Sequence, residues 1–322
     1  MKKNLRIVFM GTPEFAVASL ESLLDHYYHI VGVVTVADKP AGRGKKLQMS
    51  AVKKFALEKG LKVLTPTNLK DSQFIEALKE LQPDLQIVVA FRMLPEVVWG
   101  LPALGSFNLH ASLLPQYRGA APINHAIING EKETGVTTFF LDRKIDTGNV
   151  ILQRKCPIDE LEDAGSLHDK LMNMGANLII ETLQLIENRE VQTKPQNSYH
   201  INNLKEAPKI FKDDCRINWN AESTKIIQLI RGLSPYPAAW TQLTDKEKNK
   251  TWNCKIYKVL KTEHESAHPI GKLYATSNGE LFVSTKDYNI QIVELQIEGK
   301  KRMMAADFLR GFDITESIGF SD

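Results

Sequence analysis

The sequence predicts an α/β protein in which a Rossmann-like open parallel sheet domain is followed by a small C-terminal β-barrel of the oligonucleotide-binding type. Three observations predict this fold. The chain has 322 residues, more than the roughly 250–300 at which a single hydrophobic core stops growing. Strand-like and helix-like segments alternate in the first half. Short strands separated by turns fill the last third.

Composition excludes several classes of protein. A hydrophobic fraction of 43% and a charged fraction of 25% are average for globular chains, so a largely disordered chain is excluded. The three cysteines are widely spaced and form neither a CxxC zinc motif nor a disulfide framework. This usage favours a reducing, cytoplasmic environment. No stretch approaches the roughly 20 apolar residues of a membrane span, so no membrane partner is expected.

Hydrophobic periodicity defines the elements of the first domain, expected over residues 1–188. Strands are expected where short apolar runs end in turns, at 6–10, 30–36, 62–64, 84–90, 107–109 and 136–141. Helices are expected where apolar residues recur at helical spacing, at 14–24, 50–59, 72–81 and 166–186. Alternation of this kind predicts a parallel sheet covered by helices on both faces.

The pattern changes after residue 188. Residues 189–208 are polar and lose the helical period, which predicts a linker. The C-terminal domain is then expected over 209–322. It contains one amphipathic helix at 223–232 and five short strands, at 240–243, 252–260, 270–275, 281–285 and 290–295. Five strands in about 75 residues are typical of a small barrel.

The turn after the first strand argues against a dinucleotide site. Gly11-Thr12-Pro13 does not match the GxGxxG spacing, and proline removes a backbone donor that a phosphate would need. A tight turn with Pro13 in the first turn of the helix explains the segment. A nicotinamide-dependent dehydrogenase is therefore disfavoured.

The loop after the second strand is strongly basic. Residues 39–54 contain six basic and no acidic side chains, among them Arg43, Lys45 and Lys46. The segment lacks the spacing and the Ser/Thr of a Walker loop. A solvated loop is one interpretation. The other is a contact with a nucleic-acid backbone, for which Gly42 and Gly44 would let the chain bend around Arg43.

The strand at 107–109 and the residue after it contain the strongest candidates for catalytic side chains. Alternation along a strand points Asn108 and His110 to the same face, at the carboxyl end of what we expect to be a switch-point strand. Two adjacent polar side chains are costly to bury without a purpose. An amide and an imidazole so placed could bind one developing oxyanion. A lone histidine would more often be a satisfied core residue.

Asp146 lies in a loop between two expected strands. One interpretation is an Asx-type turn without chemistry; the other makes Asp146 the carboxylate that completes an Asn–His–Asp set. A single Asp-Thr-Gly triplet in this fold does not indicate an aspartic protease. The remaining histidines show no ligand spacing with cysteines or carboxylates, so no metal is expected.

Taken together, these motifs resemble the folate-dependent formyltransferases over nearly the whole chain. The resemblance rests on Asn108-x-His110-x-Ser112-Leu113-Leu114-Pro115, on Tyr117-Arg118-Gly119-x-x-Pro122 and on Asp146-Thr147-Gly148. The opening at 11–16, the basic loop at 40–46 and the segment 231–240 narrow it to members that act on methionyl-tRNA. Departures are minor: Phe91-Arg92 stands in the pterin-side loop where some members carry Tyr-Gly, and Asn218 where many carry Asp.

The resemblance implies formyl transfer from 10-formyltetrahydrofolate to the α-amino group of initiator methionyl-tRNA. It implies that Asn108, His110 and Asp146 are catalytic. It also implies that Ser112, Leu113, Leu114 and Pro115 line the folate site, and that Arg43, Lys45 and Lys46 contact the tRNA. A monomer is expected, because nothing marks a large exposed apolar face.

Two alternatives remain open from the residues. A formyltransferase for a glycinamide ribonucleotide or a sugar-nucleotide amine would not need the barrel or the basic loop. A non-catalytic RNA-binding protein would keep the barrel but has no use for the Asn–His–Asp set. A local excess of lysines in the barrel supports a phosphate contact over a merely solvated face: Lys246, Lys248, Lys250, Lys255, Lys258 and Lys261.

Overall fold

The computed structural model describes residues 5–41, 46–199 and 203–321. The chain folds into two compact units. The first consists of the chain up to Pro122 together with Glu133–Pro157 and His168–Ala207. The second consists of Ile123–Lys132, Ile158–Leu167 and the chain from Pro208 onward. Within the described ranges, no helix has the length and apolar character needed to cross a membrane.

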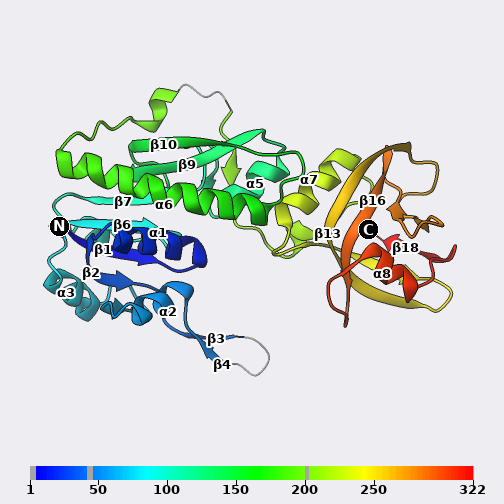
Figure 1. Cartoon of the computed structure of the whole chain (residues 1–322), viewed down its shortest axis with the longest axis horizontal. Coiled ribbons are helices and arrows are strands. Elements are labelled where there is room, and N and C mark those ends of the chain that lie inside the picture. The colour runs from blue at the N-terminus through cyan, green and yellow to red at the C-terminus, as the bar shows by residue number, and fades with distance from the viewer. Residues whose placement is uncertain (1–4, 42–45, 200–202, 322) are drawn as a thin grey trace. The chain divides into compact units, whose positions relative to one another are not determined.

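A seven-stranded sheet forms the centre of the first unit, in the order β10-β9-β7-β6-β1-β2-β5 (Figure 1). Its strands are β1 (Arg6–Gly11), β2 (His29–Val34), β5 (Val63–Leu64), β6 (Leu85–Val89), β7 (Ser106–His110), β9 (Glu133–Phe140) and β10 (Val150–Pro157). The five strands from β7 to β5 run parallel, as predicted. The strand order reverses between β1 and β6. β7 therefore lies one strand beyond the switch point, and the expectation that it borders that point was wrong.

One strand departs from the parallel arrangement that the sequence predicts, because β9 runs antiparallel to both β7 and β10. For the next strand to run parallel, a crossover must return the chain to the end of the sheet at which the previous strand began. After β7 the chain makes no such crossover. Instead β9 begins beyond the carboxyl end of β7 and runs back along it, pairing Thr137 with His110 and Phe140 with Phe107.

The helices before residue 189 are α1 (Glu14–Asp25), α2 (Ala51–Glu58), α3 (Ser72–Glu80), α4 (Glu96–Trp99), α5 (Pro122–Ile128) and α6 (Ala164–Asn188). Four of them, α1, α2, α3 and α6, form close to where the apolar period predicts them, and two short ones, α4 and α5, were not predicted from that period. Among them, α2 and α3 begin at side-chain caps. The hydroxyl of Ser50 accepts from the Lys53 amide at 3.0 Å, and the carboxylate of Asp71 accepts from the Phe74 amide at 3.1 Å. Such caps satisfy amides that have no partner inside the helix.

Different helices cover the two faces of the sheet, and this decides where the polar residues of β7 point. On one face, Val8 and Val88 pack with side chains of α3 and α4. On the other face α6 lies close to β7, where a Cβ on Gly175 would meet the Leu109 side chain at 2.6 Å. Because side chains alternate along a strand, Asn108 and His110 point away from α6.

Short paired strands complete the first unit. β3 (Lys39–Ala41) and β4 (Lys46–Gln48) form an antiparallel hairpin that projects from the unit (Figure 1). β8 (Arg118–Gly119) pairs in parallel with β11 (Glu206–Ala207). Between α6 and β11 lies a 3-10 turn, η1 (Gln196–Tyr199). The segment predicted as a linker thus carries structure that joins the first unit.

The second unit is a nearly closed antiparallel barrel, with strands in the order β14-β15-β16-β13-β12-β18. Its elements are η2 (Asp213–Cys215), α7 (Ser223–Leu233), β12 (Ala239–Asp245), β13 (Lys250–Glu265), β14 (Leu273–Ala275), β15 (Leu281–Val283), β16 (Tyr288–Ile297), β17 (Met303–Met304), α8 (Ala305–Arg310) and β18 (Ile318–Ser321). An antiparallel bridge between Lys272 and Gly319 joins its two edges. The five predicted strands and the helix are confirmed, whereas β17, β18 and α8 were not predicted.

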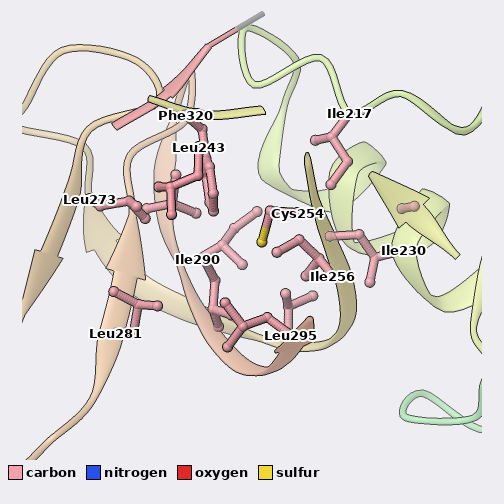
Figure 2. Packing of buried hydrophobic residues seen from close by; sticks show 14 of the residues in the cluster. Ile217, Ile230, Leu243, Cys254, Ile256, Leu273, Leu281, Ile290, Leu295 and Phe320 are labelled. Carbon is pink, nitrogen blue, oxygen red and sulfur yellow. The ribbon is translucent and has the colours of Figure 1, made fainter. Parts of the chain in front are cut away.

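The barrel is filled by aliphatic side chains from its strands and from α7 (Figure 2). Ile256, Leu281 and Ile290 have no exposed surface. Cys254 on β13 lies among them, and its burial raises the pKa of the thiol from 9.0 to about 12. Cys156 and Cys215 are also free and buried.

We expect the three thiols to be unreactive in the folded protein. A thiol with a pKa near 12 is about 10⁻⁴ thiolate at pH 8, and the thiolate is the reactive form. The measurement is labelling by a chromogenic disulfide reagent at pH 8, with and without denaturing urea. We expect three thiols to react in urea and fewer than one in ten molecules to react without it. Fast labelling of Cys254 in the native protein would contradict the described core.

Candidate active site

His110 occupies the last position of β7 and is only 7% exposed. Its ring nitrogen Nε2 lies 2.8 Å from the backbone oxygen of Tyr117. A carbonyl oxygen can only accept a hydrogen bond, so Nε2 carries the proton. In the neutral imidazole, Nδ1 is then an acceptor.

Asp146 reaches His110 from the loop between β9 and β10. Because β9 ends opposite Phe107 at the start of β7, this loop turns back along the face of β7. The Asp146 Oδ2 lies 3.8 Å from His110 Nδ1. The same oxygen accepts a hydrogen bond from the Gly119 amide at 2.9 Å. Asp146 itself has a φ of 54°, a left-handed conformation that costs a non-glycine residue about 1–2 kcal/mol.

Asn108 lies on the same face, two residues before His110. It is half-buried and pairs in register with Val88 on β6 and Phe139 on β9, both of which are buried. Among the residues that the structure describes, none hydrogen-bonds to its side-chain amide. The structure thus brings together Asn108, His110 and Asp146 around one face of β7, with the amide open to a ligand.

The predicted folate residues follow β7 and are mostly buried. The Ser112 hydroxyl donates to the Gln116 carbonyl at 2.6 Å, and the Leu114 side chain packs against Phe139 and Val150. Pro115 is also buried, while Leu113 is half-buried. These residues form the loop beside the site, and direct contact with folate stays a prediction.

The predicted tRNA residues fall largely outside the described chain. Arg43 and Lys45 lie outside the described residues, and of Lys46 only the backbone is described, as the first residue of β4. Elsewhere in the basic segment, Lys53 forms an ion pair with Asp38 at 2.7 Å. That side chain is therefore anchored within the first unit.

A cleft of about 780 Å³ lies beyond the carboxyl ends of β5 and β6. Its walls are formed by two stretches of chain, residues 67–70 and 92–97. The second stretch follows β6, the strand that pairs directly with β7. The walls include the apolar side chains of Leu69, Leu94 and Val97. Arg92 in the second wall links it to the first, donating to the Thr67 carbonyl at 2.8 Å and also to the Pro66 carbonyl.

Sequence reasoning missed three groups that shape the site. The Tyr117 carbonyl fixes the His110 tautomer, and the Gly119 amide holds the Asp146 carboxylate. A backbone group leaves no trace in residue type, although the left-handed φ of 126° at Gly119 explains why glycine stands there. The third group is Gln196, which donates to the Asp146 carbonyl at 2.9 Å. It lay hidden in a stretch that lacks any hydrophobic period.

Among the described residues, the structure contains no group of three or more His, Cys, Asp or Glu side chains that could hold a metal ion. The chemistry available at the site is that of an amide donor, an imidazole and a carboxylate. Such a set can stabilise charge on an oxygen and move a proton from a nitrogen.

Comparison with known proteins identifies both units. A family model described as formyl transferase matches residues 5–183, and one described as formyl transferase, C-terminal domain, matches residues 209–313. A methionyl-tRNA formyltransferase of Parabacteroides distasonis is 53% identical over 97% of this chain and 97% of its own. One of Flavobacterium johnsoniae is 53% identical over 99% of this chain and 98% of its own.

Solved structures show the same fold at lower identity. HypX from Aquifex aeolicus, solved in complex with tetrahydrofolic acid, is 18% identical with a TM-score of 0.65. The match covers 99% of this chain, which spans about half of HypX, 51%. WlaRD, a sugar 3N-formyl transferase, is 23% identical with a TM-score of 0.60, covering 93% of this chain and 100% of its own.

We expect Gly119→Ala to destabilise the first unit and to displace Asp146. Its φ is unfavourable for alanine, and the added Cβ would collide with the Ala207 carbonyl oxygen. Gly60→Ala is the matched control, because its φ of 67° is also left-handed but nothing lies within 4 Å. Urea unfolding should show a loss of about 1 kcal/mol for Gly60→Ala, the strain alone, and clearly more for Gly119→Ala. Equal losses would contradict the close approach of β8 and β11.

Proposed function

The chain belongs to the formyl transferase family, alongside the methionyl-tRNA formyltransferases, and from that membership we propose that Asn108, His110 and Asp146 carry its reaction. The reaction transfers a formyl group from 10-formyltetrahydrofolate to the α-amino group of initiator methionyl-tRNA, which gives N-formylmethionyl-tRNA for translation initiation. One observation carries the proposal. A free amide donor and two hydrogen-bond acceptors converge on one face of β7.

Asn108 is the donor for the oxygen that gains negative charge when an amine attacks a formyl carbon. Asn108 is fixed in register between buried Val88 and Phe139, and substrates that cover its half-buried amide would exclude water from it. A hydrogen bond to a developing charge is stronger there than in water. Loss of one such donor raises the barrier by roughly 2.7–4 kcal/mol.

Asp146 orients the amine, and His110 accepts a proton from it. With Nε2 bound to the Tyr117 carbonyl, neutral His110 presents Nδ1 as an acceptor, 3.8 Å from the Asp146 oxygen. Two acceptors at this distance suit one N–H donor placed between them. Asp146 orients the methionyl ammonium and His110 Nδ1 takes its proton, after which the carboxylate stabilises the imidazolium. The neutral amine then attacks the formyl carbon, and the oxygen of the tetrahedral intermediate accepts from Asn108 and from protonated His110 Nδ1. As the intermediate collapses, the bond from its carbon to the folate N10 breaks and His110 returns its proton to N10, while the second proton of the amine leaves to solvent.

Bound 10-formyltetrahydrofolate supplies the formyl group as an amide. The cleft between residues 67–70 and 92–97 fits a fused ring system, because its volume lies within the roughly 300–1,000 Å³ of small-molecule sites and its walls are largely apolar. Its second wall follows β6 and so begins one strand from Asn108. The loop after β7 borders the site and contains Ser112, Leu113, Leu114 and Pro115. Since the side chains of Ser112 and Leu114 are already engaged within the protein, we assign this loop to the folate site mainly through its backbone.

The tRNA meets basic side chains on both units. In the first unit we assign Arg43, Lys45 and Lys46 to the acceptor end. In the barrel, cations lie over half-buried indole rings: Lys212 and Arg216 stand 5.6 Å from the Trp240 ring centre, and Lys250 stands 4.9 Å from that of Trp252. Positive charge with aromatic surface is typical of nucleic-acid contacts. The six lysines singled out from the sequence are all exposed.

The protein acts as a monomer in the cytoplasm. Three free, buried cysteines and the absence of any disulfide among the described residues suit a reducing compartment. A cytoplasmic location also places the enzyme beside its charged tRNA substrate.

The defining experiment measures transfer of labelled formyl from 10-formyltetrahydrofolate to charged initiator tRNA. Uncharged tRNA and free methionine serve as acceptor controls, and a sugar-nucleotide amine tests the competing acceptor class. We expect label only on the charged tRNA. Label on the sugar amine alone would overturn the assigned acceptor.

We expect Asn108→Ala to lower kcat by about 100- to 1,000-fold, the usual effect of removing an oxyanion donor. Binding of tRNA should stay within twofold, because Asn108 faces the formyl oxygen. Asn188→Ala, which changes an exposed amide at the end of α6, is the control and should leave kcat unchanged. Single-turnover formylation at saturating substrates gives the rates. Near-normal turnover in Asn108→Ala would remove Asn108 from the mechanism.

Neutralising Lys212, Arg216 and Lys250 together should weaken tRNA binding and flatten its dependence on salt. Each lost phosphate contact lowers the slope of log K against log salt by about 0.7–0.9. Lys79→Ala is the control, because Lys79 on α3 is paired with Glu76 at 2.8 Å. Binding is measured by titration at several salt concentrations. An unchanged slope in the triple variant would mean that these cations do not contact the nucleic acid.

A further inference from the structure

A single buried amide, that of Gln196, connects the parts of the chain that hold Asp146. Gln196 begins η1 and is 5% exposed. Its Nε2 donates to the carbonyls of Asp146 and Gly148, at 2.9 and 2.8 Å. Its Oε1 accepts from Nε and Nη2 of Arg118, at 3.0 and 2.6 Å. These four contacts fix the orientation of the amide, because a reversed amide would face donors with donors.

Through Nε2, Gln196 fixes the backbone of the loop that carries Asp146. The two carbonyls it holds flank Thr147, just after the left-handed residue Asp146. Such a conformation persists only where the surrounding structure enforces it. Gln196 therefore stabilises the turn that directs the Asp146 carboxylate toward His110.

Through Oε1, Gln196 also binds Arg118, which is next to the residue that donates to the Asp146 carboxylate. Arg118 directly precedes Gly119, whose amide donates to Asp146 Oδ2 at 2.9 Å. One side chain thus contacts the backbone of Asp146 and the residue next to Gly119, the donor that positions the carboxylate. It also binds both Nε and Nη2 of the Arg118 guanidinium.

The geometry points to Gln196 as a positioning residue that acts on formyl transfer through Asp146. The inference rests on the proposed function, since it needs Asp146 to orient the amine. It also gives residues 189–208, expected from sequence to be a linker, a part in the active site. Gln196 touches no substrate in this role, so its effect should fall on the rate of transfer rather than on binding.

The test compares Gln196→Ala and Gln196→Glu with a matched control, Gln116→Ala. Glutamate keeps an acceptor for Arg118 but loses the donors to the two carbonyls, so the near-isosteric variant isolates the contact with the Asp146 loop. The Gln116 side chain ties the same segment, donating to the Asn203 carbonyl at 2.8 Å and accepting from the Lys205 amide at 2.7 Å, without contacting Asp146. It therefore reports the effect of loosening the segment alone.

We expect both Gln196 variants to lose about 10- to 100-fold in kcat, the range that a shift of about 1 Å produces. KM for the folate and the tRNA should stay within about twofold, as should kcat of Gln116→Ala. Rates are taken by single turnover at a temperature at which circular dichroism shows each variant folded. Wild-type kcat in Gln196→Glu, or an equal loss in Gln116→Ala, would overturn the inference.

A double-mutant cycle with Asp146→Asn separates this inference from the proposed function. In the Asp146→Asn background, Gln196→Ala should cause at most a further twofold loss, because residues that act together are non-additive. A full second loss would show that Gln196 acts by another route. If Asp146→Asn itself keeps wild-type kcat, the proposed function fails. If Asp146→Asn is impaired but Gln196 variants are not, only the inference fails.

Discussion

The active site depends on one constraint of topology, the lack of a crossover after β7. Because the chain stays at the carboxyl end of β7, β9 must run back along it. The loop that follows β9 therefore begins beside the amino end of β7, whereas His110 lies at the carboxyl end. The loop therefore has to fold back over the face of β7 to reach His110. That return explains the left-handed φ of Asp146 and the tight packing of Gly148 against the Phe140 carbonyl.

A loop under such a constraint needs contacts from outside itself. Thr147 donates to the Asp142 carboxylate at 2.8 Å within the loop, but this bond does not set the direction of Asp146. The direction of the Asp146 side chain is set by hydrogen bonds from Gly119 in β8 and from Gln196. Gln196 belongs to the chain between α6 and β11, and β11 pairs with β8. The segment between the two units is thus a structural part of the first, and its polar composition reflects hydrogen bonding to the site.

Sequence reasoning succeeded where one local rule decides the outcome. Period-two alternation placed Asn108 and His110 on one face, and helical spacing located α6 and α7. The resemblance to known motifs added Asp146. Reasoning failed where the outcome depends on distant partners. Strand-helix alternation cannot report the direction of β9, which follows from a missing crossover. Residues 318–321 become the strand β18 because β12 offers an edge, and Gln196 matters because of carbonyls about 50 residues away in the chain.

The way charge is distributed around Asp146 suits an amine substrate better than a permanent ion pair. The carboxylate accepts one hydrogen bond from a neutral amide and faces an imidazole nitrogen 3.8 Å away that carries no proton in its neutral form. Had Arg118 paired with it, the carboxylate would have bound a fixed cation and lost its attraction for an ammonium group. The guanidinium hydrogen-bonds to Gln196 instead of occupying the Asp146 carboxylate. The carboxylate can therefore orient the incoming methionyl amine, and His110 can take the proton that the amine must lose before its nitrogen attacks.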